Sequence, residues 1–408
     1  MHQAAGRAKQ KFLFLLIVSI AYLVLITWHD FLQRPFLWDE SHFWDASLTF
    51  SDNLIPELEE LRNYGELNTP LPFIIFGGLE YLFSQGIFAG RLFNLILSIV
   101  AVFIIGWPGQ SRGMQAILCA IGVLSCPYYL WYSGLLYTDA LAYFWVLVGL
   151  VCYVYERHGL SCVAFILAIA SRQYAIAFPA AIVLREFSIA VVRAKKQGQV
   201  RLADQWRWLI PTLAALSIVG WILLFGGLAP EASLESATVA VPEVQETVWA
   251  ITPGGATNFL AFVGLYLVIP EFILFRYWRR GSLQESRRAM LIAAGLLVWF
   301  IVFPPLPSAL GILDKITDPL PSALGAALAY GLALAACLRF FRSNLLFLFL
   351  LFNSLIMMKA YPWDKYILPF AVAFWYLKSL NLEDRFAVGE RMPANHRLGL
   401  SATSTPDL

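Results

Sequence analysis

Apolar runs separated by short polar or charged segments account for most of the chain. Many of these runs are apolar on every face rather than along one stripe, which is the pattern of helices that cross a lipid bilayer. They are too long and too uniformly apolar to be strands of a membrane barrel. The pattern therefore predicts an all-α, polytopic transmembrane protein with about 11 to 13 spans.

Twelve runs can be drawn as spans, although several are shorter than the ~20 residues of a straight crossing. They are predicted at Phe12–Trp28, Arg91–Trp107, Met114–Trp131, Leu136–Tyr155, Leu160–Ala170, Tyr174–Phe187, Trp208–Leu228, Asn258–Phe275, Met290–Phe303, Leu320–Leu338, Leu345–Met358 and Tyr366–Leu377. The first run follows Arg7, Lys9 and Lys11 and lacks a small-residue cleavage site, so we expect a retained anchor rather than a signal peptide.

Composition agrees with this pattern and excludes several classes of protein. Hydrophobic residues make up 59% of the 408 residues and charged residues only 14%, whereas soluble domains contain about 25% charged residues. The formal net charge of +2 gives no reason to expect a nucleic-acid partner. All five cysteines lie in apolar segments without CxxC spacing, so we expect small buried side chains rather than a metal or redox site.

The positions of Lys and Arg predict the orientation in the membrane. With a cytosolic N-terminus, 22 of the 29 Lys and Arg residues fall in inner loops or in the C-terminal tail, as the positive-inside rule requires. Both termini are then cytosolic, and residues 29–90 form a first external loop with amphipathic helices. Because this orientation keeps residues 29–90 on the external side, Thr69–Phe83 must lie on the membrane or dip into it without crossing. Its prolines and glycines favour such an element.

We expect residues 1–380 to form one transmembrane domain. Residues 229–257 hold four glutamates, no Lys or Arg, and several prolines and glycines. This composition predicts a mobile external loop, which is either a lid or simply a solvated acidic segment. The polar residues 381–408 are predicted to be a disordered cytosolic tail.

A few ionisable residues are predicted at the outer membrane face, from segments far apart in sequence. They are Asp39, Glu40, Arg91, Asp139, Arg172 and Lys365. Because charged groups are costly at membrane depth, they suggest a functional site by default. Carboxylates can accept a proton from a hydroxyl nucleophile, and cations can stabilise a phosphate leaving group.

Each of these residues also has a structural interpretation. Asp39 or Glu40 could cap the amphipathic stretch Ser41–Leu48, and Asp139 could cap the fourth span. Arg172 could extend to the interface, and Lys365 could be an ordinary flanking charge. His42 lies one helical turn from Asp39 and is either its hydrogen-bond partner or structural.

Several short motifs in order along the chain resemble a known superfamily. The "WDE" of Trp38–Glu40, the "TPLP" element and the second span at Ile87–Gly106 look like the C-type (GT-C) integral-membrane glycosyltransferases. The segments "CPYYLWYSGLLYTDALAYF" and "SRQYAIAF" resemble the subgroup that includes the dolichyl-phosphoglucose α-1,2-glucosyltransferases. The late "WDKYILPF" is similar to a superfamily motif that precedes the last spans. The chain departs from the pattern by having "TPLP" for "PPL" and no large soluble domain.

The resemblance implies roles for individual residues. Asp39 would be the general base, with Glu40 as its orienting partner, an acceptor ligand or the base itself, and Asp139 a second carboxylate. Arg172 and Lys365, with Arg91 a weaker candidate, would bind the donor phosphate. His42, Tyr137, Gln173 and Tyr366 would contact substrate. Some superfamily members use a divalent metal, but no ligand spacing in this chain supports one, so we predict no cofactor.

The leading hypothesis is a multi-pass glycosyltransferase of the bacterial inner membrane or endoplasmic reticulum. It would move a hexose from a polyprenyl-phosphate donor to a hydroxyl of a lipid-linked or protein acceptor on the extracytoplasmic face, with inversion. Transfer of mannose or an aminopentose to protein or lipid is the alternative within the class. A transporter or lipid flippase is the rival from another class, but the chain shows neither inverted repeats nor charges near the midplane. If the chain were a non-catalytic scaffold, we would not expect carboxylates and cations from distant segments to converge.

Overall fold

The computed structural model describes residues 2–109, 112–198, 202–236, 250–276, 283–306 and 311–383. Within these ranges the chain is helical and contains no strand. The helices are α1 (His2–His29), α2 (Glu40–Leu48), α3 (Leu58–Asn63), α4 (Leu71–Phe83), α5 (Ile87–Gly106), α6 (Gly113–Leu124), α7 (Pro127–Ser133), α8 (Asp139–Val154), α9 (His158–Ser171), η1 (Gln173–Ile176), α10 (Ala177–Gln197), α11 (Leu202–Phe225), α12 (Glu231–Ser236), α14 (Gly254–Val263), η2 (Gly264–Val268), α15 (Ile269–Phe275), α16 (Leu283–Val302), α17 (Ile312–Thr317), α18 (Ser322–Phe340), α19 (Leu345–Met357), η3 (Asp364–Ile367) and α20 (Leu368–Ser379).

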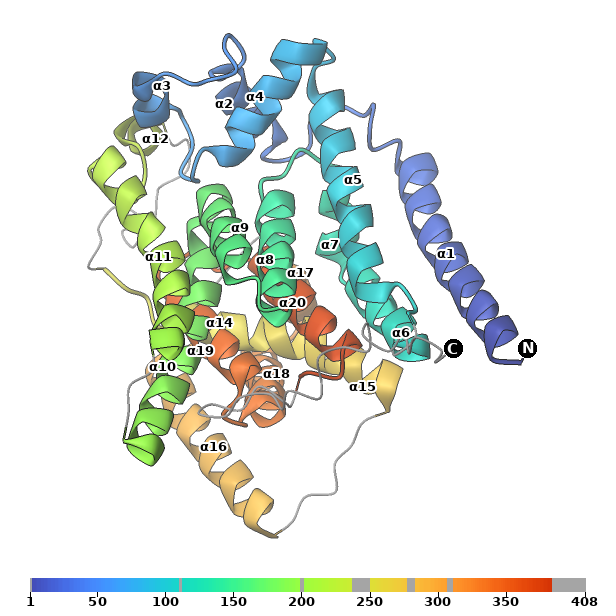
Figure 1. The fold of residues 1–408 in the computed structure, drawn as a ribbon, viewed down its shortest axis with the longest axis vertical. Coiled ribbons are helices and arrows are strands. Elements are labelled where there is room, and N and C mark those ends of the chain that lie inside the picture. The colour runs from blue at the N-terminus through green and yellow to red at the C-terminus, as the bar shows by residue number, and fades with distance from the viewer. Residues whose placement is uncertain are drawn as a thin grey trace, which may run out of the picture.

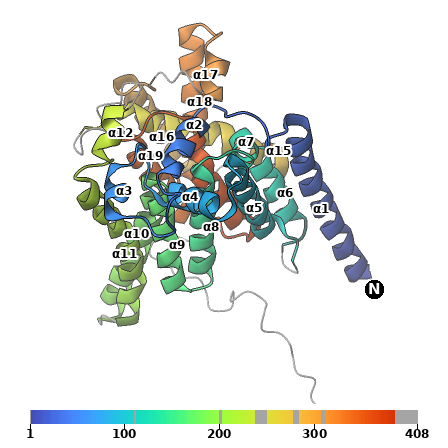
Figure 2. The same ribbon diagram turned by 90° about the horizontal axis from the view of Figure 1, so that it is seen from above.

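The helices form an elongated bundle with two different ends (Figure 1). The short helices α2, α3 and α4 cover one end, which we call the cap end. Seen from above in Figure 2, they overlie the bundle, and α4 packs on α2, α5 and α9. The start of α1, the start of α6 and the ends of α15, α18 and α20 mark the opposite end, which we call the terminal end. The long α1 stands at the edge of the bundle, against α5, α6 and α7.

Six helices of the described ranges are long and apolar enough to cross a membrane, or seven if the bent pair α6–α7 counts as one span. Four shorter apolar helices, α4, α8, α9 and α19, accompany them. The prediction of a polytopic, all-α membrane protein is therefore confirmed. A total of about 11 to 13 crossings requires that some shorter helices cross as well.

One predicted span is not a single helix. The run Met114–Trp131 divides into α6 and α7, whose axes differ by 76°. Pro127 is the first residue of α7 and has no backbone N–H to continue the ladder of α6, while the residue before a proline disfavours the helical conformation. Cys126 is accordingly extended, with φ −76° and ψ 112°.

Other helices run beyond the predicted spans. Helix α10 continues to Gln197, ten residues past the predicted end at Phe187, because a helix can leave the apolar layer with charged residues on its last turns.

The run Asn258–Phe275 is interrupted by the π-helix η2. There the Cα of Gly264 lies so close to the Leu332 carbonyl oxygen of α18 that a Cβ would overlap it.

Helix α4 corresponds to the predicted non-crossing element Thr69–Phe83. Pro70 occupies its N-cap position, and its 13 residues are too few for a full span. It packs on α2 at Gly77, where a Cβ would overlap the Ser47 carbonyl oxygen of α2 and lie 2.6 Å from that of Phe50, just after α2. Whether α4 lies on or dips into the membrane stays a prediction. Of the predicted acidic loop and tail, residues 237–249 and 384–408 lie outside the described residues.

Candidate functional site

Four charged residues from distant segments meet at the cap end. Asp39 precedes α2, Asp139 is the first residue of α8, Arg172 follows α9, and Lys365 belongs to η3. Asp139, Arg172 and Lys365 are buried, whereas the Asp39 side chain is 34% exposed. Neither aspartate caps its helix, because no side-chain cap hydrogen bond forms at Asp39, and Thr138 holds the N-cap position of α8. We call these four residues the cap cluster.

The inner part of the cap cluster is the ion pair between Asp139 and Arg172. Arg172 Nη2 donates to Asp139 Oδ2 at 2.8 Å, and the Tyr174 hydroxyl donates to Oδ1 at 2.7 Å. Arg172 Nη1 also donates to the side-chain oxygen of Asn68. Arg172 Nε has no hydrogen-bond partner among the described residues. Both oxygens of the Asp139 carboxylate are therefore occupied, while the guanidinium keeps one donor for another group.

The outer part is the ion pair between Lys365 and Asp39. Their Nζ and Oδ2 atoms are 3.3 Å apart. Lys365 Nζ also lies 3.3 Å from the centre of the Trp363 ring and 4.9 Å from that of Tyr137, which favours the cation. Burial is nevertheless the larger influence and lowers the pKa of Lys365 to about 8. The ammonium group is thus held at the edge of the cluster, beside the exposed carboxylate.

Glu40 and Arg91 form a separate buried pair. Arg91 donates from Nε and Nη2 to the two Glu40 oxygens at 2.9 and 2.7 Å, in a bidentate geometry. Glu40 also accepts from the backbone N–H groups of Leu37 and Leu136, and Arg91 donates to the Arg34 carbonyl. Both side chains have 0% exposure. The structure therefore does not bring Glu40 and Arg91 into contact with the cap cluster, although both were candidates for it.

The four residues that were predicted to contact substrate do not all lie beside the cap cluster. Tyr366 lies against Arg172 with its ring centre 5.8 Å from the guanidinium carbon. Tyr137 stacks on Tyr132 with ring centres 4.1 Å apart. Gln173 faces the loop after α3 and donates to the Leu67 carbonyl at 2.8 Å. His42 is exposed on α2. Tyr137 and Tyr366 therefore line the cap cluster, whereas Gln173 fixes a loop over it.

Sequence reasoning missed Glu66, which lies in that loop. Burial raises the pKa of Glu66 to about 7, against the opposing influence of Arg172 and Lys365 and with the help of the Asp39 charge. These influences place its carboxyl group in the field of the cap cluster. The signal available in the sequence was its position three residues before Thr69, the first residue of the "TPLP" element. Tyr174 was missed as well, although it follows Arg172 by two residues.

Two further charged residues, close to Lys365 in sequence, have structural partners. Asp364 is buried next to Lys365, but it accepts from the Tyr266 hydroxyl at 2.5 Å and from the Ile312 N–H at 2.8 Å. It therefore ties η3 to α17 and η2. Lys359 donates to the Ala250 carbonyl and holds the segment before α14.

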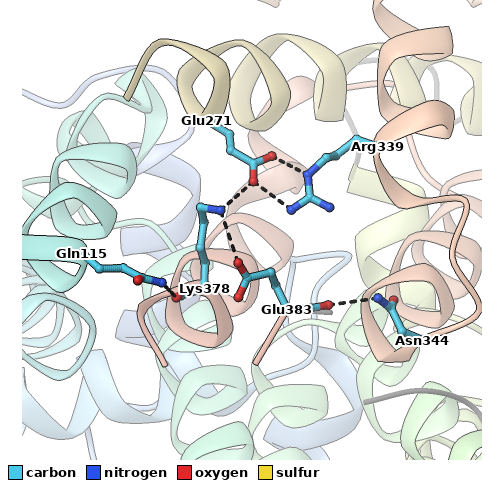
Figure 3. A network of polar contacts seen from close by, with 6 residues as sticks. All are labelled: Gln115, Glu271, Arg339, Asn344, Lys378 and Glu383. Atoms are coloured by element: carbon cyan, nitrogen blue, oxygen red, sulfur yellow. Dashed lines mark hydrogen bonds and ion pairs between the residues drawn. The ribbon is translucent and has the colours of Figure 1, made fainter. Parts of the chain in front are cut away.

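A second polar network joins α15, α18 and α20 at the terminal end (Figure 3). Glu271 of α15 accepts from Arg339 of α18 at 2.6 Å and from Lys378 of α20 at 2.8 Å. Lys378 also lies 3.4 Å from Glu383, whose backbone carbonyl accepts from Asn344. The two cations and two carboxylates contact one another, as Figure 3 shows, so this network is a brace between helices.

The cap cluster can perform proton transfer and phosphate binding. Asp39 combines a carboxylate with solvent access, and Lys365 and the Arg172 guanidinium provide cations within the same cluster. Among the described residues, no group of three or more His, Cys, Asp or Glu side chains has the geometry of a metal site. The expectation of a metal-independent reaction stays a prediction.

Comparison with known families identifies the chain's relatives. The family model described as the DIE2/ALG10 family matches residues 80–283, which is half of the chain. The matched region contains Asp139 and Arg172 but neither Asp39 nor Lys365. No curated protein and no solved structure matches the chain. The chain belongs to the DIE2/ALG10 family, the dolichyl-phosphoglucose α-1,2-glucosyltransferase group of the C-type membrane glycosyltransferases.

Proposed function

We propose that this membrane glycosyltransferase moves a hexose from a polyprenyl-phosphate donor to a hydroxyl of a lipid-linked or protein acceptor. The observation that supports this most is the meeting of Asp39, Asp139, Arg172 and Lys365 at one end of the bundle. Family membership supports a dolichyl-linked donor. A transporter would instead hold its ionisable groups near the bilayer midplane, at the interface of two repeats.

In the proposed reaction the donor phosphate binds between Lys365 and Arg172. The free N–H of Arg172 Nε and the ammonium of Lys365 are its hydrogen-bond donors. In this proposal the phosphate replaces Asp39 as the partner of Lys365, because the lysine ammonium is a point charge with rotatable donors on a flexible stem and can turn to a new anion. The Asp39 carboxylate is thereby released to accept a proton. Asp139 and Tyr174 stay bonded to each other and keep the guanidinium in place.

The chemical step is a single displacement. The acceptor hydroxyl loses its proton to Asp39 as its oxygen forms a bond to the anomeric carbon. The bond between that carbon and the phosphate oxygen breaks, and its electron pair leaves with the polyprenyl phosphate. The phosphate charge changes from −1 to −2, and Lys365 and Arg172 stabilise the added charge. One displacement inverts the anomeric configuration.

Glu40 and Arg91 act as positioning residues in this proposal. Their buried pair fixes the start of α2 against Leu136, just before α8. Asp39 and Asp139 lie next to these two fixed points. The pair therefore sets the distance between the two aspartates without contacting substrate.

We place the cap end on the extracytoplasmic side. Lys9 and Lys11 at the start of α1, Arg112 before α6 and Arg339 in the last turn of α18 lie at the terminal end, and the positive-inside rule puts that end in the cytosol. Both termini then lie in the cytosol, and α2–α4 cover the site from outside.

Purified protein in lipid nanodiscs tests the proposed function. It is given radiolabelled glucose or mannose on polyprenyl phosphate, or the same sugars on a nucleotide, with lipid-linked oligosaccharide as acceptor. We expect transfer from polyprenyl-phosphate glucose and an inverted anomeric centre in the product, read by NMR. Transfer from the nucleotide sugar, or retention of configuration, would contradict the proposal. Preference for the mannose donor would support the alternative within the class.

A further inference from the structure

Glu66 lies in a loop that is held closely over the cap cluster. The Tyr64 hydroxyl donates to the Asn68 carbonyl at 2.5 Å, and Thr69 donates to the Ile169 carbonyl of α9 at 2.8 Å. Arg172 and Gln173 bond to Asn68 and Leu67 from the other side. These contacts on both sides of Glu66 fix its backbone, so its approach to the cluster is built into the fold.

The cap cluster has more carboxyl groups than cations once Glu66 is included. Arg172 is paired with Asp139 at 2.8 Å and Lys365 with Asp39 at 3.3 Å. Glu66 makes no ion pair within the described ranges, yet the charges of Arg172, Asp39 and Lys365 all influence its pKa. The phenol of Tyr64 also lies within its electrostatic reach. With Glu66 ionised, the five groups carry one net negative charge, and with Glu66 neutral they carry none.

With Glu66 ionised, an anionic donor would therefore bind to a site that already carries a net negative charge. A polyprenyl-phosphate sugar is a phosphodiester with one negative charge at neutral pH. An ionised Glu66 would repel it in a buried setting, where charges interact strongly. A protonated Glu66 would instead offer an O–H donor to a phosphate oxygen.

We propose that Glu66 is a further residue of the donor site, which binds the donor phosphate in its protonated form so that donor binding takes up one proton. This inference rests on the proposed function, since it takes the phosphodiester donor as the ligand. It assigns a task to a carboxyl group beside the cap cluster that has no part in the proposed transfer reaction. The site would consequently bind its donor more tightly in mildly acid solution.

The direction of the pH effect follows from linkage. A pKa near 7 means that Glu66 is mostly protonated below pH 7 and mostly ionised above it. If only the protonated form binds, the Michaelis constant for the donor rises about fivefold from pH 7 to 8 and approaches a tenfold rise per pH unit at higher pH. Lys365, with a pKa near 8, adds a second loss of affinity at higher pH. Replacing Glu66 removes the first loss of affinity and leaves the loss caused by Lys365, so the two can be measured separately.

The variant Glu66→Gln keeps a neutral hydrogen-bonding side chain, and Glu59→Gln, on the exposed face of α3, is its control. We measure the donor Michaelis constant and kcat from pH 6 to 9 for wild type and both variants. The expected result is a constant Michaelis constant for Glu66→Gln between pH 6 and 7.5. Wild type and Glu59→Gln should show the rise above pH 7. A wild-type profile in Glu66→Gln would overturn the proposal, and so would an inactive but folded Glu66→Gln.

A binding experiment without turnover separates this proposal from the proposed function. Polyprenyl-phosphate glucose is added to wild-type protein without acceptor at pH 7.5, and proton uptake is followed with an indicator dye in weak buffer. The phosphodiester does not titrate near this pH, so uptake approaching one proton per donor bound comes from the protein. We expect uptake in wild type and in Glu59→Gln. At pH 7.5 Lys365, with a pKa near 8, can itself take up about a quarter of a proton when an anion binds. Wild-type uptake no greater than this amount would refute the role of Glu66 even if transfer occurs, and the wild-type measurement remains decisive if Glu66→Gln fails to fold.

Discussion

Asp39 and Glu40 are neighbours in sequence but differ in their surroundings. Glu40 is fully buried and bonded to Arg91 and to two backbone N–H groups, whereas Asp39 is partly exposed beside Lys365. Successive residues on a helix point about 100° apart, so only one of the two can face a common site. Sequence alone identified the pair but could not choose between its members, because that choice depends on what packs against each face.

Removing the charge of Glu40 should destabilise the protein rather than abolish its chemistry. The variant Glu40→Gln leaves the buried Arg91 guanidinium without its anion, which typically costs about 3 to 5 kcal/mol. We expect a lower midpoint of thermal unfolding in detergent than for the exposed-site control Glu59→Gln. Unchanged stability together with complete loss of turnover would instead identify Glu40 as the base.

The rarity of charge in this chain explains why most of the cap cluster was predictable. Asp139, Arg172 and Lys365 stand out because their flanking segments are apolar and ionisable groups are costly there. Glu66 did not stand out, because it lies in a polar loop where a glutamate is ordinary. Its role emerges only when the loop folds back over Arg172 and Gln173.

The positions of many helices were more predictable than their shapes. Uniform apolar runs predicted where helices lie, and α5, α18 and α19 begin and end near the predicted spans. Such runs carry no information on bends inside them. The 76° turn between α6 and α7 and the π-helix η2 depend on how neighbouring helices approach. Glycines at close contacts, such as Gly264, mark these places but do not reveal the partner.

The contact between α2 and α4 offers a matched pair of glycine variants. A Cβ on Gly77 would overlap the backbone of Ser47 in α2 and of Phe50 just after it, whereas a Cβ on Gly78 would meet only Leu54, at 3.9 Å. We expect Gly77→Ala to lower stability by about 1 to 3 kcal/mol through overpacking. Gly78→Ala should be neutral or stabilising by up to about 1 kcal/mol, since alanine favours helix. Equal unfolding midpoints for the two variants would show that α4 does not pack on α2 in this way.

The molecule as a whole has a polar network at each end of an apolar bundle. The terminal network around Glu271 balances its own charges and ties α15, α18 and α20 together. The cap cluster keeps an exposed carboxylate and an unbonded guanidinium N–H. We propose that this difference separates a structural network from the site of transfer, although both contain two acidic and two basic residues.

The proposed orientation can be tested by labelling from one side of the membrane. Cysteines are introduced singly at Asp52, in the loop after α2, and at Glu156, between α8 and α9. In intact cells or sealed vesicles, we expect an impermeant maleimide to label Asp52→Cys from the extracytoplasmic side and Glu156→Cys only after permeabilisation. The parent protein, with its five native cysteines, gives the background. The reverse labelling pattern would place the cap cluster in the cytosol.

The most direct measurement is turnover of the Asp39→Asn variant with polyprenyl-phosphate glucose. Asparagine keeps the shape of the side chain but cannot accept the acceptor's proton, and general-base catalysis commonly contributes about 10²- to 10⁴-fold. The control is Asp45→Asn, on the exposed face of α2. We predict that Asp39→Asn lowers kcat by at least about 100-fold with an unchanged unfolding midpoint, while Asp45→Asn stays at the wild-type rate. Wild-type turnover by a folded Asp39→Asn enzyme would contradict the assignment of the cap cluster as the site of transfer.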